Sequence, residues 1–446
     1  MTSLTDHPTV RRFYELAPPP GPMAPVPDPV ELKLACREFG ADDVGFVDIE
    51  RPEIADQRAD ILAAFPRPQT LISYVVRMNR ESVRSPARSV ANLEFHRSGH
   101  EVDDVGHRIA AMLEGRGIRA MNPAMGFPME MDRWPGKTWV VSHKPVAVAA
   151  GLGQIGIHRS LIHPRFGSFV LLGTVITEAR IATPAPQPLA FNPCLECKLC
   201  VAACPTGAIG AKGEFNYSAC YTHNYREFMG GFDDWVENLA DSGNRYEYRR
   251  RVSDAETVSI WQSLGFGPNY KAAYCIAVCP AGEEVIRPFL QERAAYLRDV
   301  VRPLQDKPET VYVTPGSDAE AYVPRRFPWK KVKAVGNGLR PDSIDGFLFG
   351  LTLIFQPGRA KGLDATYHFT FRGEETRSAT VCIKKGTLEV KQGHVGKADF
   401  SLSADARTWL RFLAKETSLA WAVLRGRIRF RGSPRLLLAF ARCFPS

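Results

Sequence analysis

The chain has 446 residues, which is enough for roughly two to four domains with cores of their own. Its net charge of +9 is moderate, and its basic residues are scattered rather than interleaved with aromatic ones, so we expect no nucleic acid partner. No apolar stretch approaches the roughly 18–20 residues of a membrane-spanning helix, so we expect no transmembrane segment. Seven of the ten cysteines fall between residues 194 and 279, a grouping typical of metal binding in a reducing compartment, and we therefore expect a cytoplasmic protein.

The first 29 residues are rich in proline and are predicted to be disordered. They contain the pair Arg11-Arg12, but no apolar segment follows it, so the pair is not expected to act as an export signal. We expect residues 1–29 to contribute nothing to a packed core.

Residues 30–185 are predicted to form a first domain in which helices and strands alternate. Such alternation is typical of a layered domain of the α/β or α+β class. Helical spacing of apolar residues and β-rich apolar runs predict helices at 31–39 and 102–113 and strands at 43–48, 70–76 and 168–176.

A glycine-rich run lies late in this domain and is followed by a histidine. A Gly-x-Gly-x-x-Gly pattern alone is a weak sign of dinucleotide binding, and the required strand–glycine–helix context, with an acidic residue about 20 positions on, is missing here. We therefore expect the glycines either to let a flat or bulky group approach the backbone or to form a tight turn. The residues concerned are Gly151, Leu152, Gly153, Gln154, Ile155, Gly156 and His158.

The most specific motif is a run of cysteines with the spacing C-x2-C-x2-C-x3-C-P, which is that of bacterial ferredoxins. Its members are Cys194, Cys197, Cys200 and Cys204, followed by Pro205. The two-residue gaps let a tight loop place three thiolates around one iron–sulfur cluster, and the fourth cysteine of such a run ligates the other cluster in two-cluster proteins. Zinc is the weaker alternative, because zinc sites pair two Cys-x2-Cys segments.

A second, shorter motif, Cys275-x3-Cys279-Pro280, supplies ligands that a two-cluster arrangement requires. By pseudo-symmetry, Cys194, Cys197, Cys200 and Cys279 are expected to hold the first cluster. Cys204, Cys220 and Cys275 are then expected to hold the second. Ala272 stands where a full second motif would have a cysteine, so the second cluster has three thiolates and one open or unusual position. His223 as the fourth ligand, a three-iron cluster, a four-iron cluster with another non-cysteine ligand, and a single cluster with spare buried cysteines all stay open.

The remaining chain is predicted to contain a second domain, a linker and a third domain. Residues 186–300 form the cysteine domain, whose loops would be held by metal rather than by a large core. Residues 301–342 are rich in proline and charge and are predicted to be a linker. Residues 343–446 are predicted to form a small α+β domain that ends in an apolar helix opened by Ser433-Pro434. Its strands are expected at 366–371, 378–383, 387–391, 400–402 and 427–431.

The glycine run, the segments Leu161–Pro164 and Phe166–Phe169 and the ferredoxin-type cysteine run resemble the epoxyqueuosine reductase family over residues 35–290. Phe95–His100 resembles a further motif of that family. Its members are cobalamin-dependent iron–sulfur reductases related to the reductive dehalogenases. The resemblance implies a nitroreductase-like domain that binds cobalamin at the glycine run and His158, and a ferredoxin-like domain whose two 4Fe-4S clusters feed electrons to the cobalt. Flavin is the alternative cofactor, because nitroreductase-like folds also bind flavin.

The chain departs from this family immediately before the glycine run. The family has an Asp-Thr-Gly-Pro segment whose aspartate donates a proton, whereas this chain has Val141-Ser142-His143-Lys144-Pro145. Synthesis of queuosine is therefore not expected. His143 or Lys144 could take over proton delivery, since both side chains can donate a proton, and a hydrogen-bonded structural role is the alternative for His143.

The third domain resembles the lipid-binding domain of sterol carrier protein. The resemblance rests on Thr366–Phe371, Gly386–Val390, Asp399–Leu402 and Gly426–Gly432. It implies an apolar ligand held in a tunnel between sheet and helices, and the alternative is a solid core without a tunnel.

Together these features predict an α+β multidomain protein and two competing functions. In the first, an electron donor such as ferredoxin or flavodoxin reduces the clusters, the clusters reduce cobalamin, and an apolar or lipid-like substrate is dehalogenated or deoxygenated. In the second, the chain is a non-catalytic electron-transfer, lipid-binding or lipid-sensing protein that has lost cobalamin binding. The retained glycine run favours the enzyme, whereas the missing aspartate and the missing cysteine favour the alternative.

Overall fold

The computed structural model describes residues 4–16, 27–182 and 188–446. Part of the segment predicted to be disordered, 1–3 and 17–26, lies outside the described residues. Between these gaps the chain forms a short 3-10 turn, Leu4–Asp6, and helix α1, Pro8–Leu16, none of whose residues is buried. The helix differs from the expected disorder but, as expected, adds nothing to a core.

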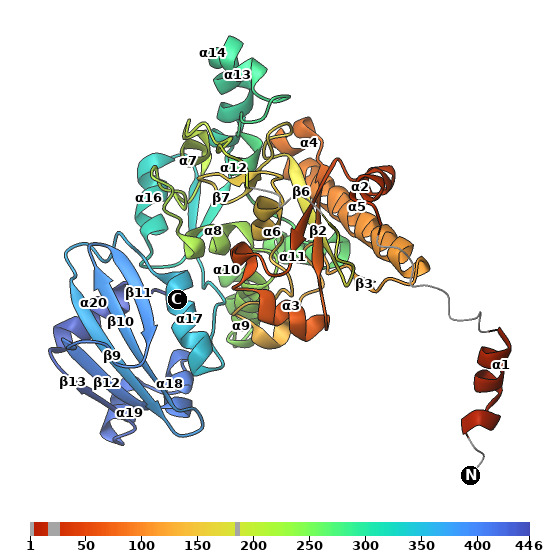
Figure 1. Ribbon diagram of the computed structural model, residues 1–446. Coiled ribbons are helices and arrows are strands. Elements are labelled where there is room, and N and C mark those ends of the chain that lie inside the picture. The colour runs from red at the N-terminus through yellow and green to blue at the C-terminus, as the bar shows by residue number, and fades with distance from the viewer. Residues whose placement is uncertain (1–3, 17–26, 183–187) are drawn as a thin grey trace.

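The first domain is built on a four-stranded antiparallel sheet with the order β1-β2-β6-β3. The central strands β2 and β6 are almost entirely buried because helices cover both faces of the sheet (Figure 1). One core packs α2 and α5 against Ile72 and Val76, and the opposite core packs α3 and α6 against Leu71 and Val75. The strands are β1 (Asp43–Asp48), β2 (Thr70–Arg77), β3 (Ala120–Met121) and β6 (Val170–Thr177). The helices are α2 (Pro29–Glu38), α3 (Arg58–Ala64), α4 (Arg80–Arg84), α5 (Arg88–Gly115) and α6 (His143–Ala149), with 3-10 turns at Pro52–Ile54 and Met131–Arg133.

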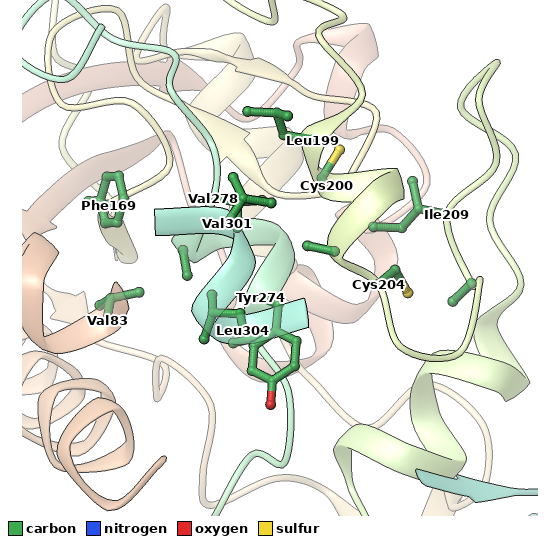
Figure 2. Close-up of a cluster of buried hydrophobic side chains, with 14 of the residues drawn as sticks. Val83, Phe169, Leu199, Cys200, Cys204, Ile209, Tyr274, Val278, Val301 and Leu304 are labelled. Carbon is green, nitrogen blue, oxygen red and sulfur yellow. The ribbon is translucent and has the colours of Figure 1, made fainter. Parts of the chain in front are cut away.

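The cysteine region packs directly against this domain. Its core joins Phe169, beside β6, to Cys200, Cys204 and Tyr274 (Figure 2). The short helices α7 and α12, which carry cysteines, contact one another. The helices here are α7 (Leu199–Ala203), α8 (Tyr217–Asn224), α9 (Gly230–Ala240), α10 (Arg245–Arg251), α11 (Asp254–Phe266), α12 (Tyr274–Ala277), α13 (Arg287–Gln291) and α14 (Arg293–Tyr296), followed by a π-helical turn at Leu297–Val301.

The segment 301–342 differs from the predicted linker, because it is folded into the cysteine domain. Leu304, Val311 and Val323 are completely buried in the same core as Cys200 and Cys204. Proline and charge suggested an extended tether, but apolar residues between them are spaced to fill this core. The elements are α15 (Arg302–Gln305), β7 (Thr310–Val313), α16 (Asp318–Arg326) and β8 (Lys331–Ala334), and β7 pairs with β8 in parallel.

The C-terminal domain is a five-stranded sheet, β11-β10-β9-β12-β13, with helices packed on one face. All neighbouring strands are antiparallel except β9 and β12. The strands are β9 (Ala365–Arg372), β10 (Arg377–Lys384), β11 (Thr387–Gln392), β12 (Phe400–Asp405) and β13 (Ile428–Arg431). The helices are α17 (Ile344–Ile354), α18 (Ala406–Leu413), α19 (Leu419–Leu424) and α20 (Pro434–Arg442). The α+β multidomain class is confirmed.

One buried glutamine connects the C-terminal domain to the cysteine domain. The Oε1 atom of Gln356 accepts hydrogen bonds from Asn216 Nδ2 at 3.0 Å and from the Asp318 backbone N–H at 2.9 Å. Asn216 also caps α8 through its side-chain oxygen, and α8 carries Cys220. In the described parts of the chain, we find no helix that is both long and apolar enough to cross a bilayer.

Candidate functional site

The loop that carries the first three cysteines has the backbone of a ligand-wrapping turn. Glu196 and Lys198, between the cysteines, have φ angles of 48° and 61°, in the left-handed region that non-glycine residues seldom adopt. This curvature brings the chain back so that Cys194 packs against the small buried cluster of Ile162, Cys279 and Ala281, and Cys279 belongs to the second motif. Burial raises the pKa of Cys279 to about 11, and the neighbouring charges of Cys197 and Cys194 add to the increase.

Cys200 lies beside Cys197 and Cys279 of the first group. Burial raises the pKa of Cys200, and Cys275, Cys279 and Cys197 are its charged neighbours. Cys200 and Cys204 lie at the two ends of α7 and their side chains point apart (Figure 2). One short helix therefore directs one cysteine toward each group.

The second group consists of Cys204, Cys220 and Cys275, which come from α7, α8 and α12. Burial raises the pKa of Cys275 to about 12, and the charge of Cys204 adds to the increase. Burial also raises the pKa of Cys220, and Cys204 and Cys275 contribute to the increase. All three side chains are therefore mutual neighbours, and Cys275 is in addition a neighbour of Cys200 in the first group. The two groups adjoin each other.

These donors fit iron–sulfur clusters. All seven cysteines are free thiols, and thiolates are the ligands that such clusters take. Within the described ranges, no three histidine, cysteine or acidic side chains converge as they would around a single metal ion. A cluster fills the space between its ligands, so its thiolates stand farther apart than those of a zinc site.

His223 does not join the second group. Its Nδ1 accepts a hydrogen bond from the Tyr312 backbone N–H at 3.3 Å, and its ring stacks on the Tyr312 ring. Burial lowers the pKa of His223 to about 4, and its charged neighbours are Glu309 and nearby lysines, not cysteines. His223 is thus turned toward β7, although it lies only one helical turn from Cys220.

Lys144 is the charged side chain beside the second group. Its ammonium is a charged neighbour of both Cys220 and Cys275, and it donates a hydrogen bond to the Arg159 carbonyl at 2.8 Å. Burial lowers the pKa of Lys144, yet the residue retains exposed surface. These two facts agree if the side chain lies in a recess, surrounded by protein but reachable from solvent.

His143 has both ring nitrogens engaged. Nδ1 lies 2.9 Å from the Thr174 hydroxyl and Nε2 lies 3.1 Å from the Ala124 carbonyl oxygen. The carbonyl can only accept, so Nε2 carries the proton and Nδ1 accepts from Thr174. Burial lowers the pKa of His143 and favours this neutral form. The geometry supports a structural role at the start of α6 rather than proton delivery.

The glycine run forms a small hairpin of β4 (Gln154–Ile155) and β5 (Leu161–Ile162) rather than an open cradle. A Cβ atom on Gly153 would lie 2.5 Å from the Ile162 carbonyl oxygen, and one on Gly156 would lie 2.6 Å from Ile162 Cδ1. Gly151, at φ 75°, ends α6, and the backbone N–H of Leu152 bonds back to Ala147. The group that comes close to Gly153 and Gly156 is strand β5 of the same chain and not a ligand. Of the two expectations for the glycine run, the tight turn therefore fits the structure.

The hairpin presents one group suited to a ligand, the imidazole of His158. Its Nδ1 accepts from the Ser160 backbone N–H at 3.1 Å, which leaves the proton on Nε2. Nε2 is buried and has no partner among the described residues. Burial lowers the pKa of His158 to about 4, and Lys144 is the neighbouring cation that adds to this. An unpaired N–H beside Lys144 fits a ligand rich in acceptor oxygens, and the amide groups around a corrin ring are of that kind.

A pocket of about 750 Å³, which sequence reasoning missed, lies between the first domain and the cysteine domain. It is lined by α5, α11, the loop 269–271 and the segment 307–312. Arg88, in its wall, lies 5.3 Å from the Tyr274 ring centre and has Cys275 as a charged neighbour. The only sequence signal was the Phe95–His100 motif, whose His96, Arg97 and His100 line the pocket.

Two parts of the chain are similar to different known proteins. Residues 355–445 match the SCP-2 sterol transfer family. Over 154 residues the chain is 32% identical to epoxyqueuosine reductase of Synechococcus sp. (strain RCC307), which covers 34% of this chain and 44% of that protein. It is 37% identical over 86 residues to the Listeria monocytogenes epoxyqueuosine reductase, covering 19% and 22%. The chain thus spans less than half the length of these curated relatives.

The chain is also similar to solved structures of other epoxyqueuosine reductases and of reductive dehalogenases. The epoxyqueuosine reductase of Streptococcus thermophilus is 18% identical with a TM-score of 0.33, over 43% of this chain and 56% of that one. A catabolic reductive dehalogenase in complex with 3-bromo-4-hydroxybenzoic acid is 14% identical with a TM-score of 0.35, over 60% and 35%. Another similar structure is an epoxyqueuosine reductase with a tRNA-Tyr epoxyqueuosine-modified stem loop. This finding contradicts the expectation that nucleic acid is not a partner. That expectation rested on the scattered basic residues, and such a distribution does not exclude RNA binding in a protein with relatives of this kind. The resemblance itself, an epoxyqueuosine reductase-like segment joined to a sterol carrier-like domain, is confirmed.

Proposed function

We propose that the chain is an iron–sulfur reductase in which two clusters deliver electrons to a cofactor held beside Lys144 and His158. The observation that carries this proposal is the adjacency of the two cysteine groups, the second of which borders Lys144. Cys194, Cys197, Cys200 and Cys279 would hold one cluster, and Cys204, Cys220 and Cys275 the other. The second cluster would need a fourth ligand other than cysteine, and Lys144 is the charged side chain that borders this group.

Electrons would enter at the first cluster. Cys194 and Cys197 are only partly buried, and the neighbouring side chains of Phe191 and Leu195 are 58% and 42% exposed. A small donor protein such as ferredoxin or flavodoxin could approach this surface. The adjoining Cys200 and Cys275 would then carry the electron inward to the second cluster.

The cofactor we propose is cobalamin, with flavin as the alternative. Lys144 and the unpaired His158 Nε2–H would hold it by donating hydrogen bonds to its acceptor groups. When bound, cobalamin would supply two-electron reduction chemistry, which clusters that transfer single electrons do not provide. Lys144 would orient the reacting group and hold a proton at Nζ for the product, the role that an aspartate has in the resembled family.

The substrate we propose is an apolar or lipid-like molecule that loses a halide or an oxygen substituent. Reductive cleavage of a carbon–halogen bond consumes two electrons and one proton and releases halide, whereas loss of a hydroxyl group as water consumes two electrons and two protons. The two clusters would supply one electron each through the cofactor, Lys144 would supply one proton, and solvent would supply the second proton where water is released. The sterol carrier-like domain supports an apolar substrate. Its core contains the Trp409 indole, 5% exposed, whose Nε1–H is buried without a partner among the described residues. An apolar ligand that carries one oxygen atom would satisfy that donor.

The alternative is a non-catalytic electron-transfer or lipid-binding protein. Ala272 in place of a cysteine and the absence of the family's aspartate from residues 141–145 favour it. The unpaired His158 N–H next to Lys144 favours the enzyme, because a buried donor without a partner is costly unless a ligand satisfies it.

The proposal is tested by anaerobic purification with cobalamin supplied. We expect broad iron–sulfur absorption together with resolved cobalamin bands, and cobalamin in the mass spectrum of the extracted cofactor. Turnover of halogenated apolar compounds and of epoxyqueuosine-modified tRNA is then compared under a low-potential donor. Broad absorption alone, with no cofactor extracted and no turnover of either substrate, supports the non-catalytic alternative.

A further inference from the structure

The pocket between the first domain and the cysteine domain is lined by an arginine whose hydrogen bonds are incomplete. Arg88 is the first residue of α5, and its Nη1 donates to the Ser85 carbonyl oxygen at 3.3 Å. Its Nε and Nη2 atoms are buried and have no hydrogen-bond partner among the described residues. These two atoms form one edge of the planar guanidinium, so their N–H groups point the same way. A buried donor without a partner is costly, and here two such donors lie side by side.

The positive charge of Arg88 has no carboxylate of its own among the described residues. Glu309 is a charged neighbour, but its Oε1 is bonded by Lys330 and its Oε2 by the Tyr274 hydroxyl, each at 2.7 Å. Lys307, in the same pocket, also forms no ion pair with a described residue. Burial lowers the pKa of Lys307, and the neighbouring charge of Arg88 lowers it further. The pocket therefore holds two cations that an anionic ligand would stabilise.

The start of α5 adds to this positive charge. The helix has 28 residues, its N-cap Ala87 forms no side-chain hydrogen bond, and no acidic residue lies in its first turn. The positive end of the helix dipole is thus uncompensated, and Arg88 and Ser89 of this turn line the pocket. A helix start alone would not define a site, but here it coincides with the unpartnered edge of Arg88.

The free donors match one carboxylate group. Two neighbouring donors are already engaged, since the Asn92 amide donates to the Tyr270 carbonyl oxygen and Lys271 is paired with Glu227. The edge of Arg88 offers two parallel N–H groups, which is the arrangement that binds both oxygens of a planar carboxylate.

The rest of the pocket wall suits an apolar body. Leu93 and Phe266 line the pocket and are 60% and 71% exposed, and the Tyr270 side chain also contributes to the wall. A volume of about 750 Å³ is in the range of sites for small organic ligands. A strand of RNA could contact the exposed Arg97 and His100, but its phosphates would leave the apolar side chains uncovered.

We propose that this pocket binds an organic carboxylate with an apolar body, whose two carboxylate oxygens accept hydrogen bonds from Arg88 Nε and Nη2. Lys307 adds a second positive charge beside the carboxylate. Cys275 is a charged neighbour of Arg88, so the bound acid would lie near the second cysteine group. That the acid is the reduced substrate rests on the proposed function, whereas its binding does not.

The test is equilibrium dialysis of the full chain, purified anaerobically without cobalamin so that binding is measured apart from turnover. The probes are 4-phenylbutyrate and its amide, which share an apolar body and differ in charge. We expect the acid to bind at least about tenfold more tightly than the amide. Arg88→Gln should weaken binding of the acid roughly 10- to 100-fold, as expected for hydrogen bonds to a charged group, and leave binding of the amide unchanged. Uptake by the C-terminal domain would persist in this variant.

A matched control is Arg108→Gln, which removes an exposed arginine from the same helix outside the pocket. It should bind the acid like the unaltered chain, and circular dichroism and iron content should be unchanged in every variant. If Arg88→Gln does not fold, Arg88→Lys tests the same hydrogen bonds, because it keeps the charge but not the two parallel donors. Equal binding of acid and amide, or equal loss in the control, would overturn the proposal. Displacement of the acid by an equal concentration of inorganic phosphate would overturn the choice of a carboxylate. Binding of an RNA stem loop that needs Arg88, without binding of the acid, would also overturn it and assign the pocket to nucleic acid.

Discussion

At the scale of single residues, the sequence motifs predicted which side chains are suited to bind a ligand, but not which distant residues those side chains contact. The spacing of the cysteines predicts which of them share a cluster, because two-residue gaps constrain the loop strongly. The role of His143 depends on Thr174 and the Ala124 carbonyl, which are distant in sequence and carry no pattern. His158 could be singled out by its motif, but its unpaired nitrogen could be found only once the hairpin was built.

Serine substitutions at Cys197 and Cys220 should separate the two clusters. A serine hydroxyl is a poor ligand for iron held by soft thiolates, so Cys197→Ser should lose the first cluster and Cys220→Ser only the second. Iron per chain and the electron paramagnetic resonance of the reduced protein measure each loss. Cys382→Ser, in the C-terminal domain, is the control and should retain all iron. Unchanged iron in the Cys197 variant would disprove the assignment.

Trp409→Phe should affect ligand affinity more than stability. The substitution removes a buried donor whose unmet hydrogen bond costs roughly 1–3 kcal/mol, so the lost ring contacts with Phe347 and Phe371 are partly offset. Affinity for a fluorescent fatty acid should fall about fivefold, the worth of one hydrogen bond of about 1 kcal/mol. Affinity for a fluorescent hydrocarbon without oxygen should not change, and an equal loss for both probes would refute the role of the indole N–H.

At the scale of elements, strands and helices with clear periodicity could be predicted, and the short paired strands could not. The expected strands at 43–48 and 70–76 match β1 and β2, because their runs are apolar and β-branched. The hairpin β4–β5 escaped prediction because two-residue strands have no periodicity. The fold of 301–342 was missed for a different reason: prolines at helix starts and inside α16 resemble those of a linker.

The hairpin should tolerate no side chain at Gly153. Gly153→Ala places a methyl group against the Ile162 carbonyl and should cost roughly 1–3 kcal/mol of unfolding free energy. It should also lower iron content, because the Ile155 carbonyl accepts a hydrogen bond from Asn192, two residues before Cys194. Gly115→Ala, where a methyl group would meet nothing within 4 Å, is the control. Equal iron content and thermal stability in the two variants would contradict this role of Gly153.

The start of α18 should make the C-terminal domain sensitive to acid. Hydrogen bonds from the Thr408 hydroxyl and backbone N–H hold the pKa of Asp405 below its usual range, against a smaller opposing effect of burial. A lowered pKa means that the stabilisation is complete above the ordinary aspartate pKa and is lost as the pH falls through the lowered value. Asp405→Ala should cost about 1 kcal/mol at pH 7 and less at pH 3. Asp405→Asn, which still caps, should lose the dependence on pH, and chemical unfolding of residues 343–446 at both pH values measures the difference.

At the scale of the whole molecule, the chain joins a cysteine-rich body to a domain with a separate core. The C-terminal aromatic residues pack on one another, as Phe440 does on Phe444 at 4.5 Å and on Tyr367 at 4.9 Å. The resemblance identified both parts from local motifs. The buried Gln356 that connects them could not be predicted, because a lone glutamine carries no signal of its partners.

Division of the chain between 342 and 343 should therefore yield two functional pieces. Residues 343–446 should fold, since all five strands and their covering helices lie within them, and should take up a fluorescent fatty acid. Residues 1–342 should retain the iron–sulfur spectrum, because all seven proposed ligands precede residue 280. Without Gln356, the Asn216 amide and the Asp318 backbone N–H would bond to water instead. Asn216 caps α8, the helix that carries Cys220 of the second group. The second cluster should therefore be lost more readily than the first when the protein is exposed to oxygen. The variant Gln356→Ala in the full chain should reproduce that lability while fatty acid uptake is unchanged. A folded C-terminal piece that binds no apolar probe would instead show that its aromatic core is closed to ligands.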